Sequence, residues 1–189
     1  LFIRQRPAMR PLIAMAFGAT VLAMPLVTFL PVFARDVFHQ GPAGYTVLLA
    51  TSGAGSVTGA VIVAALGHTP RQGRLALAFL TCFGVLMTAF AASRRLAASC
   101  TVLFFAAAAM MALFALMMSL VQSLLTDEVR GRVMSVYNVA FRGGVPFGNL
   151  ITGSLIPRFS APWVLGANGV LILLAGVYLL FVHRRIASL

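Results

Sequence analysis

The chain has 189 residues, of which 61% are hydrophobic and 9% charged, and its formal net charge is +11. A water-soluble domain normally has about a quarter of its residues charged, so this composition excludes an ordinary soluble fold. All the basic side chains are arginines, and they are dispersed between apolar stretches instead of gathered on one face. That distribution argues against a nucleic-acid partner.

Six apolar stretches follow one another along the chain, each long enough for a bilayer-crossing helix, which needs roughly 20 apolar residues. Continuous runs predict helices, because a transmembrane β-barrel has short segments of alternating hydrophobicity. We therefore expect an all-α polytopic membrane protein in contact with the lipid bilayer: a basic cytoplasmic lead-in at 1–10, a six-helix bundle at 11–182 and a cytoplasmic tail at 183–189. The spans lie at about 11–34, 43–67, 75–93, 96–121, 133–157 and 162–182.

Arginines near the span ends predict the orientation, because basic loops resist translocation. One side of the bundle has nine arginines and includes both termini, and the other has four, which are Arg35, Arg94, Arg95 and Arg158. Both termini are therefore expected in the cytoplasm, with the protein in the inner or plasma membrane.

Prolines and small residues distinguish the spans. Pro25 and Pro31 predict kinks in the first span, because proline removes a backbone donor. In the second span, Gly55 and Gly59 form a small-xxx-small pair, which allows close approach of another helix. This contact either slides during a movement or is static packing, and the sequence leaves both open. The third and sixth spans are the least distinctive in sequence and are expected at the periphery, facing lipid.

The fifth span has two different faces on a 3.6-residue helix. Gly144 and Gly148 form a second small-xxx-small pair on one face, and Pro146 between them predicts a bend. The other face has four polar residues and a glycine, which are Ser135, Asn138, Arg142, Asn149 and Gly153.

Arg142 lies ten residues after Arg132, or about 15 Å along a helix. A charge near the bilayer centre is costly unless it faces water, a cavity or a partner. We expect Arg142 to face a water-filled path and to meet an anionic substrate or a carboxylate outside this chain. The alternative is a structurally paired or snorkelling arginine.

Two predicted cytoplasmic turns, at 67–74 and 126–135, are rich in polar residues. Thr126 is placed to cap the fifth helix, and acidic residues after it suit the positive end of the helix dipole. The turns either latch neighbouring helix ends or are solvated determinants of orientation. Their candidate gate residues are Arg71, Gly73, Arg74, Asp127, Glu128, Arg130, Gly131 and Arg132.

The run Arg130-Gly131-Arg132-Val133-Met134-Ser135-Val136-Tyr137, followed by Gly144, Pro146, Gly148 and Gly153, resembles a motif of major facilitator superfamily transporters, in the branch that includes the enterobactin exporter and drug-efflux-like members. The turn at 71–74 resembles a degenerate copy of the family's loop motif, with Arg71 in place of the usual aspartate. The resemblance covers essentially the whole chain and implies helices seven to twelve of a twelve-helix carrier, whose substrate binds between two halves. With Leu1 in first place, it predicts a fragment that lacks the N-terminal half.

The expected function is export of siderophore-like or drug-like small molecules, driven by a proton gradient, with no bound cofactor and no metal. The carboxylates Asp36, Asp127 and Glu128 lie at span ends, so a coupling carboxylate is expected in the absent half. A self-contained six-helix protein that dimerises as a channel-like or scaffold subunit is the alternative. An enzyme is disfavoured, because the spans have no nucleophile–base pair or metal cluster.

Overall fold

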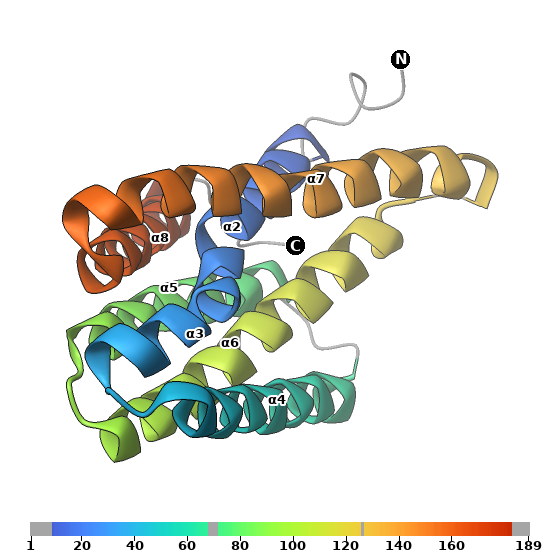
Figure 1. Cartoon of the computed structure of the whole chain (residues 1–189). Coiled ribbons are helices and arrows are strands. Elements are labelled where there is room, and N and C mark those ends of the chain that lie inside the picture. Colours follow the sequence, from blue (N-terminus) through green and yellow to red (C-terminus); the bar gives the residue numbers. More distant parts are fainter. Residues whose placement is uncertain (1–8, 68–71, 126, 183–189) are drawn as a thin grey trace.

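The computed structural model describes residues 9–67, 72–125 and 127–182, and the regular elements in these ranges are all helices (Figure 1). In chain order they are α2 (Met9–Thr28), α3 (Leu30–Val32), the π-helix η1 (Phe33–Val37), α4 (Gly41–Leu66), α5 (Gln72–Ala92), α6 (Leu96–Ser123), α7 (Asp127–Phe159) and α8 (Ala161–Val182).

The first candidate span, Ile13–Val37, consists of three consecutive helical elements, α2, α3 and η1. Its interruption is at Phe29, two residues before Pro31, and the Phe33 amide bonds to the Phe29 carbonyl at 3.2 Å. Pro31 has no amide hydrogen and its ring crowds the preceding turn, so the helix restarts at this point. Pro25 lies inside α2 without ending it.

Among the described residues, five helical segments are long and apolar enough to cross a membrane. They are Ile13–Val37, Gly41–Leu66, Gln72–Ala92, Leu96–Ser123 and Ala161–Phe181. Helix α7 has 33 residues, which is ample length, but its arginines and polar side chains keep it outside this set. The prediction of six apolar spans therefore holds for five of them.

Two predicted turns are shorter than expected. Helix α5 begins at Gln72 and α7 begins at Asp127, so 72–74 of the first polar stretch and 127–135 of the second are helical. The predicted span ends lie where charged residues begin in the sequence. A helix can extend beyond the hydrocarbon, because its polar side chains then lie in the headgroup region. The cap expected at Thr126 lies outside the described residues.

The helices pack in three principal pairs, α2 with α7, α4 with α6, and α5 with α8, while α5 also packs on α6 (Figure 1). Helix α6 is the most enclosed candidate span, because 61% of its apolar stretch is buried, compared with 22% for α4. Its small residues Ala106, Ala107 and Ala109 are buried, which lets neighbouring helices approach the centre of the bundle.

Helix α5 is less peripheral than expected. Its side chains Phe83, Met87 and Phe90 are fully buried. A Cβ at Gly84 would overlap the backbone of α8 at Leu173, so this glycine permits the close contact. The α5 sequence looks featureless because its packing rests on apolar residues and a single glycine. Helix α8 does expose large apolar side chains, including Leu174 and Phe181.

Candidate functional site

Helix α7 presents its polar stripe on the surface of the bundle. Ser135, Asn138 and Arg142 are exposed, and Asn149 is half-buried. The Ser135 hydroxyl donates to the Gly131 carbonyl at 2.9 Å. The stripe is therefore open along the described bundle, in a helix whose other side is packed.

Aromatic packing holds the orientation of Arg142. The Phe141 ring meets Phe114 of α6 edge-on, with 4.9 Å between centroids, and stacks on Tyr137 at 6.0 Å. Adjacent side chains on a helix diverge by about 100°, since a turn takes 3.6 residues. Anchoring Phe141 against α6 therefore turns Arg142 outward.

Arg142 has no hydrogen bond or ion pair with another described residue. An ion pair joins Arg35 and Asp36 at 2.6 Å, at the end of the first span. A guanidinium is costly to place at membrane depth without water or an anion. At such a depth Arg142 would need a counter-charge or solvent from outside the described part of the chain.

Asn149 supplies a second unsatisfied group on the stripe. Its Oδ1 is the one buried side-chain oxygen or nitrogen atom without a hydrogen-bond partner in the described residues. Leaving such an acceptor unpaired costs about 1–3 kcal/mol. It lies seven residues after Arg142, roughly 10 Å further along the helix. Because this oxygen is buried within the bundle, the Asn149 side chain would have to rotate before a bound molecule or a neighbouring helix could donate a hydrogen bond to it.

Two glycines of α7, Gly144 and Gly148, face α2. A Cβ at Gly148 would overlap the Val21 backbone, and one at Gly144 would lie 3.0 Å from the Thr20 Cβ. Gly153 is predicted to share the polar stripe, but a Cβ added there would lie 3.3 Å from the Phe29 ring, its nearest neighbour. Gly153 therefore faces the end of α2. The direction of the stripe changes along α7, because the helix contains Pro146 and Pro157.

The same arrangement recurs at α4. A Cβ at Gly55 would overlap the Phe104 backbone of α6, and one at Gly59 would overlap that of Ala108. In both helix pairs the residue numbers rise together along the contact, so the paired helices run parallel. Each pair thus has two glycines four residues apart against the bare backbone of its partner.

The two polar loop motifs meet near the end of α6. Gln72 and Gly73 are buried, and the Ser119 hydroxyl donates to Gln72 Oε1 at 3.2 Å. Arg130 lines a hollow of about 540 Å³ together with Ser119 and Gln122. Gln72, Ser119 and Gln122 were not among the candidate residues predicted from the sequence. The only feature that distinguishes them there is that they are polar residues in apolar helices.

The other candidate gate residues are exposed, or their side chains lie outside the described part of the chain. Arg74, Gly131 and Arg132 are exposed. Asp127 and Glu128 begin α7, but their side chains lie outside the described part of the chain, and Arg71 lies outside it entirely. No group of three His, Cys, Asp or Glu in the described residues is placed to hold a metal ion.

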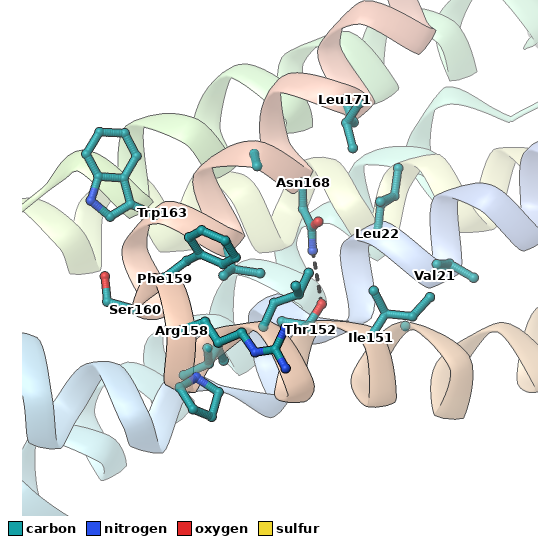
Figure 2. Close-up of a pocket in the computed structure, with 16 residues that line it drawn as sticks. Val21, Leu22, Ile151, Thr152, Arg158, Phe159, Ser160, Trp163, Asn168 and Leu171 are labelled. Carbon is teal, nitrogen blue, oxygen red and sulfur yellow. Dashed lines mark hydrogen bonds between the residues drawn. The ribbon is translucent and has the colours of Figure 1, made fainter.

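A large pocket that the sequence did not predict lies between α2, α7 and α8 (Figure 2). It has a volume of about 990 Å³ and a mainly apolar lining. Asn168 donates through Nδ2 to the buried Thr152 hydroxyl at 3.2 Å and joins α8 to α7 beside it. Both residues stand out in the sequence only as isolated polar positions.

Comparison with known proteins agrees with this architecture. Residues 2–187 match the major facilitator superfamily family described as transmembrane secretion effector. No curated protein matches the chain, and no solved structure matches it. Because the family match extends over nearly the whole sequence, the chain belongs to the transmembrane secretion effector family, a group of major facilitator superfamily membrane transporters.

Proposed function

We propose that this chain acts as the C-terminal half of a secondary transporter that exports small molecules by alternating access. The observation that carries the proposal is the symmetry of the helix pairs. An inverted repeat exchanges the first span with α6, and α4 with α7, and it then maps the α2–α7 contact onto the α6–α4 contact. The same exchange relates the glycine pair of α7, which faces α2, to the glycine pair of α4, which faces α6.

Uncovered faces on α4 and α7 support a partner of similar fold. These two helices are exchanged by the repeat, and both leave large apolar side chains exposed although they pack tightly on their inner sides. An N-terminal six-helix half, or a second copy of this chain, would cover both faces at once. The exposed apolar side chains include Val57, Val61 and Ile62 on α4 and Val139, Phe147 and Leu150 on α7.

Helix α7 is proposed as the sixth crossing. Its polar residues exclude a position surrounded by lipid, but its glycine face is covered by α2. Polar side chains within a membrane are tolerated where they border a water-filled path or another helix. The stripe would therefore face the space between the two halves, where a substrate is exposed to each side in turn.

Arg142 is the proposed substrate-selecting residue. It is charged, exposed and unpaired within the described residues, and Asn149 leaves an acceptor on the same stripe. A guanidinium offers several hydrogen-bond donors to an anion and stacks on aromatic rings. Anionic or polar-aromatic compounds of siderophore-like or drug-like kind are the substrates that this chemistry favours.

The energy source we propose is the proton gradient of the cell membrane, with both termini in the cytoplasm. Asp36 already pairs with Arg35 at a span end, and the other carboxylates, Asp127 and Glu128, start α7. A proton-binding carboxylate at membrane depth would then come from the other half.

Reconstitution with and without an N-terminal half tests the proposal. We expect proteoliposomes containing both halves to transport the anionic fluorophore carboxyfluorescein when a pH gradient is imposed, and those containing this chain alone to give only leak. Equal flux by the chain alone would contradict the half-transporter and favour a self-contained dimer. A panel of catechol siderophores and drugs would then identify the preferred substrate.

A further inference from the structure

Two apolar hollows flank α8 at one end of the bundle. The first is the pocket between α2, α7 and α8, and the second, of about 720 Å³, lies between α5 and α8. Trp163, Ala167 and Leu171 line both. Helix α8 therefore separates two adjacent grooves of a size typical of ligand sites, and neither belongs to the polar stripe of α7.

Arg158 and Ser160 lie toward one end of the first hollow, and the hydrogen-bonded pair Asn168 and Thr152 lies near its middle. Figure 2 shows Arg158, Phe159, Ser160 and Trp163 together at that end, whereas Val21, Leu22 and Leu171 lie toward the other end. A site with a charged mouth and a mainly apolar interior fits an amphiphile better than it fits a soluble ion.

Arginines stand at the mouths of both hollows. Arg158 lines the first and Arg94 the second, and both are exposed. A third hollow, of about 420 Å³, shares lining residues with the first two and is lined by Arg94, Ser160 and Asp36, among others. Asp36 already pairs with Arg35 at 2.6 Å. Arg94 and Arg158 thus have no carboxylate partner in the described residues, and this end is electropositive.

Trp163 indicates the depth of this site in the bilayer. It is 76% exposed at the start of α8, and exposed tryptophans prefer the interface between headgroups and hydrocarbon. The mouths of the hollows are then level with lipid phosphates, and their apolar linings with acyl chains. The arginine count predicts that this end lies in the outer leaflet.

We propose that this end of the bundle binds an anionic phospholipid. Its phosphate lies between Arg94 and Arg158, and its two acyl chains occupy the hollows on either side of α8. Two unpaired arginines favour a lipid with net negative charge over a zwitterionic one, because about 1 kcal/mol is gained for each basic residue near an anionic surface. Two separate grooves match the two chains of a phospholipid.

The single tryptophan of the chain makes a direct test possible, since Trp163 lies between the hollows. The full chain is placed in phosphatidylcholine vesicles containing a small fraction of brominated phosphatidylglycerol or brominated phosphatidylcholine, and quenching of Trp163 fluorescence gives relative binding constants. We expect brominated phosphatidylglycerol to quench at the lower mole fraction. Arg94→Gln or Arg158→Gln each reduces this preference about five-fold.

Matched variants separate binding from misfolding. Arg95→Gln removes a neighbouring exposed charge that lines neither hollow, so the preference should persist. The double lysine variant, Arg94→Lys with Arg158→Lys, keeps both charges and should also retain it. Equal quenching by the two lipids in the unaltered chain, a preference that survives the double glutamine variant, or its loss in the double lysine variant would overturn the proposal.

Discussion

Replacing Arg142 with alanine should reduce transport of carboxyfluorescein by the complete carrier at least ten-fold, while Arg142→Lys retains an intermediate rate. The guanidinium is exposed on the polar stripe and has no ionic partner in the described residues, so an anionic substrate is its proposed counter-charge. Loss of one charge-assisted contact costs about 1.5–3 kcal/mol, which corresponds to roughly 10-fold or more in rate or affinity. The measurement is initial flux into proteoliposomes across substrate concentrations.

The control for this experiment is Arg95→Ala, which removes an exposed arginine that precedes α6 and is not part of the polar stripe of α7. Its flux should equal that of the unaltered protein. The cationic fluorophore ethidium provides the selectivity readout, because its transport should fall less than that of the anion in Arg142→Ala. Unchanged flux of both fluorophores in Arg142→Ala and Arg142→Lys would refute the role assigned to this residue.

Gly148→Ala should destabilise the bundle by about 1–3 kcal/mol, because an added methyl group in a tight contact forces the helices apart. The new Cβ would overlap the Val21 backbone of α2, and backbone cannot rotate away as a side chain does. We expect a lower midpoint for thermal loss of the monodisperse form in detergent and less correctly folded protein.

Gly143 offers a matched control on the same helix, because a Cβ there meets nothing within 4 Å. Gly143→Ala should raise stability by up to about 1 kcal/mol, since alanine is the better helix former. Opposite signs for the two variants would support the close α2–α7 contact. A stabilising Gly148→Ala would show that the two helices do not pack as described.

The sequence predicted most of the helices because length and hydropathy alone define a segment that crosses a membrane. It placed the ends less well. Gln72 and Asp127 begin helices, although their polarity excluded them from the apolar windows. The polar stripe of α7 was predictable for a related reason, since four residues repeat on a single helix and periodicity is a local property.

Contacts between helices were harder to predict. Gln72 with Ser119, and Thr152 with Asn168, join residues that are far apart or across a turn. A single polar residue in an apolar helix does not specify its partner. The glycine pairs indicated close packing, but the identity of the opposing helix comes only from the fold.

The central claim is that α7 crosses the membrane with its polar stripe bordering water. The most direct measurement is labelling of single cysteines by a hydrophilic maleimide in the complete carrier, with Cys82 and Cys100 replaced by serine. Asn138→Cys, Arg142→Cys and Asn149→Cys should react, whereas Val139→Cys and Leu150→Cys, on the apolar flank, should not. Reaction at all five positions, or at none, would contradict the claim.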